Sequence, residues 1–122
     1  MSLLSTLKQI KLFKKGKKKA IAGNLNEAIR LFNEAYLLSS DLKSQCENLT
    51  WFHLCKALQL SKENNLLKGK EEYREFNSVH QSYIETCNST PGIGTETRYQ
   101  TWLMGIKELF TLYRNEINLL KE

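Results

Sequence analysis

Apolar residues recur every three or four positions along most of the chain, which is the period of an amphipathic α-helix. The first such segment runs from about Ser5 to Ala22, and the second runs from about Leu25 to Ser39. Gly23 and Asn24 interrupt the pattern between them, and Asn24 with Glu27 makes a capping-box pattern at the start of the second. We therefore expect two helices joined by a tight turn.

The middle of the chain has a third helical segment that is apolar on nearly every side. It starts at Ser40-Asp41 or at Ser44, because either position offers a capping side chain. A helix that is apolar nearly all round is buried between other helices, so we expect this one at the centre of the domain. Its apolar residues are Cys46, Leu49, Trp51, Phe52, Leu54, Cys55, Leu58 and Leu60.

The C-terminal half predicts two long helices, from about Leu66 to Cys87 and from Thr95 or Thr97 to the chain end. Residues 88–94 between them are rich in turn-forming residues. No segment alternates apolar and polar residues as a half-buried strand does. We therefore expect an all-α fold of about five antiparallel helices ending in a long helical hairpin, as a single domain over residues 1–122.

The net charge of +5 comes from the first segment alone. Residues 1–19 hold seven lysines and no acidic residue, whereas the remainder is slightly acidic. Four of the lysines share one helical face, at positions i, i+3, i+4 and i+7: Lys11, Lys14, Lys15 and Lys18. This strip suits an acidic peptide, a nucleic acid or an anionic membrane, or it is a solvated outer face.

Residue types with catalytic or metal-binding chemistry are present but are not arranged in any known pattern. Three cysteines, with no signal-peptide pattern and no apolar run long enough to cross a bilayer, favour a reducing cytoplasmic location. His53 and Cys55 point to different helix faces, and His80 and Cys87 lack zinc-ligand spacing. We therefore expect no enzymatic activity, no metal and no cofactor.

The first helical pair resembles the tetratricopeptide (TPR) repeat, a 34-residue helix-turn-helix unit. The positions that match its signature are Gly16, Gly23, Leu25, Ala28, Phe32 and Ala35. A second, weaker repeat places Ala57, Gly69, Tyr73 and Phe76 at related positions around Asn64, with a period of 41 residues. Whether the helices form a regular solenoid or a compact bundle stays open, and the first three could also resemble a microtubule-interacting and trafficking domain.

The resemblance implies an adaptor that binds a partner helix or peptide in a concave groove. On that basis the partner-binding candidates are Phe13, Lys14, Lys17, Trp51, Leu54 and Leu58, with Lys14 and Lys17 steering an acidic partner. The alternative for the third helix is that its apolar residues are core beneath the last helix. Phe13 and Lys17 stand where chaperone-binding members carry lysine and asparagine, so chaperone tails are not the expected partner. The alternative is binding of nucleic acid or an anionic surface through the basic first helix, and a homodimer is a further possibility.

Overall fold

The computed structural model describes residues 3–90 and 92–122, so Pro91 of the predicted 88–94 loop lies outside it. The prediction of an all-α protein is confirmed, because the described residues form helices and contain no β-strand. There are six of these helices where about five were expected. They are α1 (Leu3–Ile21), α2 (Leu25–Leu38), α3 (Leu42–Lys62), α4 (Leu66–Ser89), α5 (Thr95–Leu112) and α6 (Arg114–Lys121).

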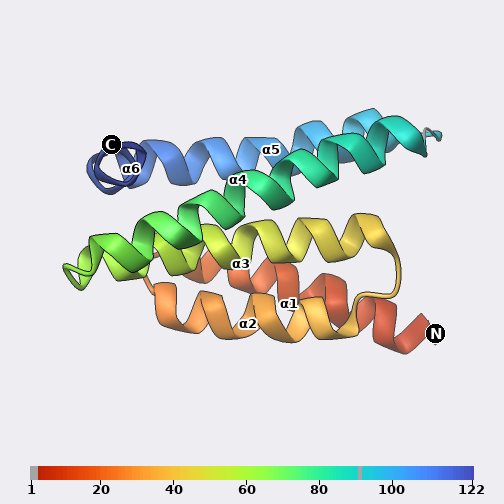
Figure 1. Ribbon diagram of the computed structural model, residues 1–122. Helices are drawn as coiled ribbons and strands as arrows, with labels where there is room; N and C mark the ends of the chain where they lie inside the picture. The colour runs from red at the N-terminus through yellow and green to blue at the C-terminus, as the bar shows by residue number, and fades with distance from the viewer. Residues whose placement is uncertain (1–2, 91) are drawn as a thin grey trace.

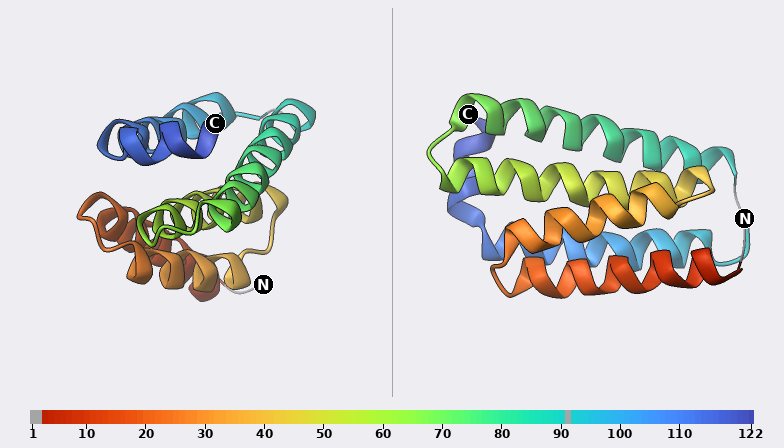
Figure 2. Two further views of the ribbon diagram at one scale, coloured as in Figure 1. Left: turned by 60° about the vertical axis from the view of Figure 1, so that its left-hand side comes forward. Right: turned by 90° about the horizontal axis from the view of Figure 1, so that it is seen from below.

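The helices are stacked around α3. In Figure 1, α4 and α5 lie above α3, while α1 and α2 lie below it. Successive helices from α1 to α4 pack against each other, and α5 contacts both α1 and α4. Figure 2 shows α1 and α5 side by side, although they come from opposite ends of the sequence. The short helix α6 crosses one end of the stack and contacts α3 and α4.

The predicted last helix is wrong in one respect, because it breaks at Tyr113 into α5 and α6. The Tyr113 hydroxyl donates a hydrogen bond to the carbonyl oxygen of Ala20 at 3.0 Å, which ties this point to the end of α1. Beyond the break, Ile117 and Leu120 are buried where α6 packs on α3 and α4. The change of direction therefore lets the chain bury two more apolar side chains.

The starts of α2 and α3 follow local capping rules, whereas those of α4, α5 and α6 have no side-chain cap. Asn24 accepts a hydrogen bond from the backbone N–H of Glu27 at 3.3 Å, as the capping pattern predicts. Asp41 does the same for Ser44 at 3.2 Å, so the earlier of the two predicted starts for α3 is the observed one. The prediction of a threonine cap on α5 is wrong, because Gly94 precedes that helix with φ +83°.

The core is one cluster of buried apolar residues drawn from all six helices. Trp51 of α3 lies at its centre and contacts the rings of Phe13 and Phe32 at centroid distances of 5.9 and 5.3 Å. Gly105 of α5 faces the same indole, and a Cβ added there would lie 2.8 Å from Trp51 Cζ2. Glycine at position 105 therefore allows α5 to approach Trp51.

Candidate binding groove

The surface predicted to hold a partner is filled by the protein itself. Trp51, Leu54 and Leu58 are completely buried, which removes them from contact with any partner in this structure. Gly105 lies directly over Trp51, so α5 occupies the position that the TPR resemblance assigns to a ligand. The predicted α1–α3 groove is thus part of the core. Its side chains hold the helices together.

The predicted residues of α1 do not form one site either. Phe13 is half-buried and packs on Phe32 at a centroid distance of 5.7 Å. The Lys17 ammonium lies 5.8 Å from the Phe13 ring and 6.0 Å from the Trp51 ring, at the margin of α5. Lys14 is exposed on the outer side of α1. Of the six predicted residues, Lys14 alone is freely accessible.

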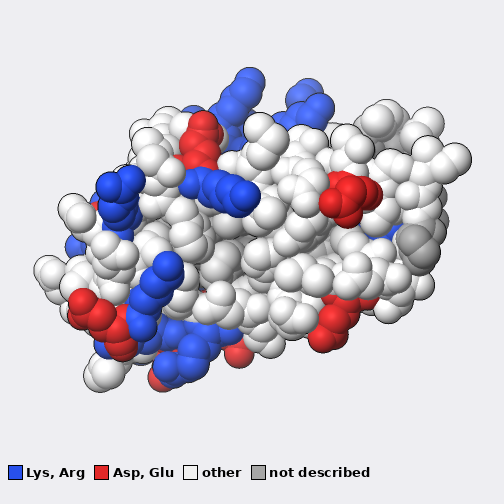
Figure 3. Space-filling view, turned by 90° about the horizontal axis from the view of Figure 1, so that it is seen from above, with Lys and Arg blue, Asp and Glu red and all other residues white. Residues whose placement is uncertain are grey.

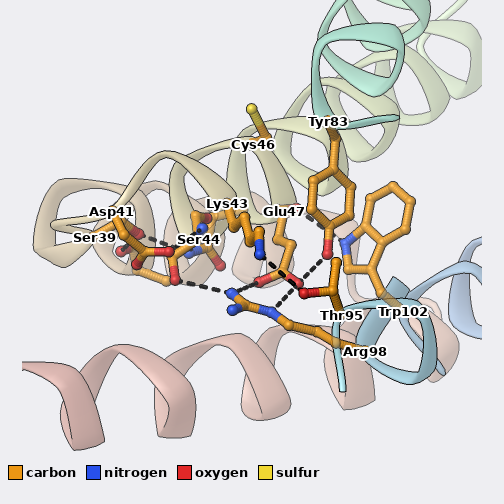
Figure 4. A network of polar contacts seen from close by, with 12 residues as sticks. Ser39, Asp41, Lys43, Ser44, Cys46, Glu47, Tyr83, Thr95, Arg98 and Trp102 are labelled. Atoms are coloured by element: carbon orange, nitrogen blue, oxygen red, sulfur yellow. Dashed lines mark hydrogen bonds and ion pairs between the residues drawn. The ribbon is translucent and has the colours of Figure 1, made fainter. Parts of the chain in front are cut away.

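Polar contacts fix the beginning of α5 to α3 (Figure 4). The Glu47 carboxylate accepts two hydrogen bonds from the Arg98 guanidinium, at 2.7 and 2.8 Å, and another from the Tyr83 hydroxyl. Arg98 also donates to the Ser44 hydroxyl at 3.1 Å. The hydrogen bond to Glu47 raises the pKa of Arg98. Burial, with the Glu47 carboxylate beside it, raises the pKa of Tyr83.

An open groove lies instead between α4 and α5, on the face seen in Figure 3. The two helices meet near their connecting loop and separate toward α6 (Figure 1). The groove has a volume of about 450 Å³. We call it the α4–α5 groove, and its lining is mainly apolar: Tyr73, Phe76, His80, Leu103, Ile106 and Phe110, with Asn77, Lys107 and Lys121 at the rim.

Basic side chains surround the end of the groove nearest α6. Lys107 and Lys121 are exposed on its rim, and the Lys121 ammonium lies 5.7 Å from the Phe110 ring. An adjoining hollow of about 430 Å³ is lined by Lys70 and Arg74 as well as Lys121, together with the acidic Glu122. Figure 3 shows most of the lysines and arginines of this face on the half nearer α6, and acidic side chains on both halves. The groove is therefore mainly apolar, and basic residues outnumber acidic ones among the side chains that line its end nearest α6.

A larger hollow of about 570 Å³ lies between α1 and the first turns of α3 and α5. Its charged groups already have partners, since Arg98 is bonded to Glu47 and the Asp41 carboxylate caps α3. A polar ligand would have to compete with these contacts. We therefore take the α4–α5 groove as the better candidate site.

His80 is the histidine of the groove wall, and it lies within an aromatic cluster. Its Nε2 atom is 3.0 Å from the Tyr99 hydroxyl, and its ring centroid is 5.2 Å from that of Trp102. Burial lowers the pKa of His80, because a charged imidazolium would lose its hydration among these rings. The neutral imidazole is thus the form that suits the folded protein.

A pH titration of stability checks this assignment. The unfolded chain binds a proton at His80 more readily than the folded protein does, so the free energy of unfolding should fall as pH drops below about 6.5. We expect that fall between pH 7.5 and 5.5 in chemical denaturation, and a flatter profile for His80→Gln. An identical profile for the variant would show that His80 does not contribute.

The cysteines and the acidic residues do not form a metal site in the part of the chain that is described. No three His, Cys, Asp or Glu side chains gather there within reach of one ion. All three cysteines are free, and burial raises the pKa of the Cys55 thiol, which disfavours the reactive thiolate. Within residues 3–90 and 92–122, no helix has the length and apolar character to cross a bilayer.

No protein-family model matches this chain, and neither a curated protein nor a solved structure matches it. Its role is therefore inferred from its own residues and geometry.

The sequence contained part of the signal for the groove. Its lining residues belong to the apolar stripes of the helices that were expected from Leu66 and from Thr95. Those stripes were expected to cover each other in a long hairpin. The observed helices diverge toward α6, and the separation leaves Leu103 and Phe110 half-buried.

Proposed function

We propose that the protein is a non-catalytic protein-interaction module that binds a helix or extended segment of a partner protein in the α4–α5 groove. The observation that carries this proposal is the groove itself, which is open to solvent and lined mainly by apolar side chains of two helices. Grooves between helices are a common site for amphipathic helices, which place apolar residues at i, i+3, i+4 and i+7 against the floor.

The TPR-like character of α1 and α2 supports an adaptor role, because helical-repeat proteins offer extended surfaces for partners. Gly16 is buried against Phe32, and a Cβ added to it would lie 2.9 Å from that ring. The small residue in the first helix thus lets the second helix pack closely, as the repeat signature implies. Since α5 covers the inner face of this pair, we place the partner on the opposite side of α5.

The charge at the α6 end favours an acidic partner segment. Lys107 and Lys121 stand at the groove rim, with Lys70 and Arg74 close by in the adjoining hollow. Complementary charge mainly raises the association rate and selects the orientation of the bound segment. Lys14, on the outer side of α1, would add to the long-range attraction that was expected of the lysine-rich helix.

Binding of selected helical peptides tests this proposal. Peptides enriched from a displayed library of amphipathic helices would be measured by fluorescence anisotropy against the parent protein, Leu103→Glu and Lys107→Glu. We expect Leu103→Glu to weaken binding at least about tenfold, because it places a charge on the apolar wall. Lys107→Glu should weaken binding chiefly at low salt.

The matched control is Leu67→Glu, which replaces an exposed leucine in the first turn of α4, outside the groove. Its affinity should stay within about twofold of the parent, since a surface change away from the contact rarely matters. Circular dichroism would establish that each variant is folded. Selected peptides that bind Leu103→Glu as tightly as the parent would refute the groove as the site.

A further inference from the structure

The outward face of α1 carries an ordered set of exposed side chains, of which the proposed function uses only Lys14. Its first two turns expose four large apolar residues, with exposed fractions of 73%, 78%, 54% and 41%: Leu3, Leu4, Leu7 and Ile10. Lysines begin in the second turn and continue for three turns along the same face: Lys8, Lys11, Lys14, Lys15 and Lys18, all exposed. The face is thus apolar at one end and strongly basic along the rest.

The helical period places these residues together. At about 100° per residue, Leu4, Lys11, Lys15 and Lys18 fall on one side of α1. The buried residues of α1 fall on the other side: Gln9, Gly16 and Ala20. The exposed leucines are therefore not the edge of the core, since they point away from it. They have no described neighbour to cover them.

The charge of this face is not cancelled by its surroundings. No acidic residue occurs in α1. On α2, which packs beside it, Glu27 and Glu34 are both engaged by Arg30. Glu27 is also close enough to Lys15 and Lys19 for their charges to lower its pKa, although its bond to Arg30 is the larger cause. The lysines of α1 outnumber these acids, and the face remains positive.

We propose that α1 binds an anionic lipid surface, lying along it with its lysines on the headgroups and its N-terminal leucines in the outer acyl region. Basic amphipathic helices bind bilayers in this manner, by combining apolar burial with attraction to acidic lipids. A nucleic acid would use the lysines but would leave four exposed apolar side chains in water. A partner helix would be better held by a groove, and of these four apolar residues only Ile10 lines one, the hollow between α1 and the first turns of α3 and α5.

The position of α1 allows this contact to be made while the α4–α5 groove is occupied. Figure 1 places α1 below α3, whereas the groove opens on the upper face, between α4 and α5. The two surfaces are separate, and neither inference depends on the other. The uncharged change Leu4→Ser with Leu7→Ser should therefore leave peptide binding in the α4–α5 groove unchanged.

Vesicle flotation tests the inference with the full chain. Vesicles of phosphatidylcholine with added phosphatidylserine should carry the protein, whereas vesicles of phosphatidylcholine alone should not. Lys11→Glu with Lys15→Glu should lower the partition coefficient at least about 25-fold, because each lysine near such a surface contributes about fivefold. Leu4→Ser with Leu7→Ser should also release the protein, since a lipid-inserted helix needs its apolar residues.

The matched control replaces an exposed leucine and an exposed lysine elsewhere, as Leu67→Ser with Lys68→Glu on α4. This variant should bind the acidic vesicles as the parent does. Failure of the parent to float with them would overturn the inference. So would full binding by the Leu4→Ser, Leu7→Ser variant, or displacement from vesicles by an equal phosphate concentration of duplex DNA. Self-association would overturn it as well. The signs would be a dimer in sedimentation equilibrium and a loss of vesicle binding at protein concentrations where that dimer forms.

Discussion

Replacement of Trp51 by alanine is expected to lower the free energy of unfolding by about 3–5 kcal/mol, the range measured for deleting a large aromatic side chain from a core. The indole has no exposed surface, and it joins three other helices. It contacts Phe13 of α1 and Phe32 of α2, and Gly105 of α5 rests against its edge. Its loss would leave a cavity. The rings of Phe13 and Phe32 could not fill it easily, because each is held by a different helix.

Urea denaturation followed by far-UV circular dichroism measures this loss, since that signal does not depend on the missing indole. Leu37→Ala serves as the comparison, because Leu37 is exposed on α2 and its truncation should change stability by about 0.5 kcal/mol or less. A Trp51→Ala protein that loses under about 1 kcal/mol would contradict the central position assigned to this residue.

The second large effect is expected for Glu47→Ala, which removes the acceptor shared by Arg98 and Tyr83. Breaking a buried ion pair costs about 3–5 kcal/mol, because the remaining charge has lost its partner. The side chains of Glu47 and Arg98 are 13% and 42% exposed, and water can reach the guanidinium. We therefore expect a loss of about 2–3 kcal/mol, below the range for a fully buried pair.

The comparison for Glu47 is an exposed ion pair of the same chemistry. Glu34 on α2 pairs with Arg30 four residues earlier, and both side chains are well exposed. Glu34→Ala should cost about 0.5 kcal/mol or less. In a double-mutant cycle, Arg98→Ala should cost much less in the Glu47→Ala background than in the parent. Additive losses would show that the two residues do not act together.

The helices themselves could be predicted from the sequence because the apolar period is clear and the caps are local. Asn24 and Asp41 accept hydrogen bonds from the backbone N–H groups three residues later, so each cap can be recognised within four consecutive residues. The break at Tyr113 had no such signal, since neither glycine nor proline lies there. It follows from a contact with Ala20, at the far end of the sequence.

The sequence left the place of α5 open, since this helix could either cover α3 or leave a groove beside it. Glycine inside a helix costs about 1 kcal/mol relative to alanine, so Gly105 indicated a close approach by some other group. Only the structure identifies that group as the Trp51 indole. The sequence left Trp51, Leu54 and Leu58 open between a binding groove and core beneath the last helix, and the structure buries all three.

The contact between α1 and α5 also affects the order in which the helices fold together. Contacts among α1, α2, α3 and α4 join successive helices, and each requires a short loop to close. The contact between Lys17 and Gly105 instead joins residues 88 positions apart in the sequence. The chain loses the conformational entropy of closing this long loop before the contact can stabilise the protein. Docking of α5 is thus the late step, and damage to that contact should mainly speed the departure of α5 while leaving the early collapse unchanged.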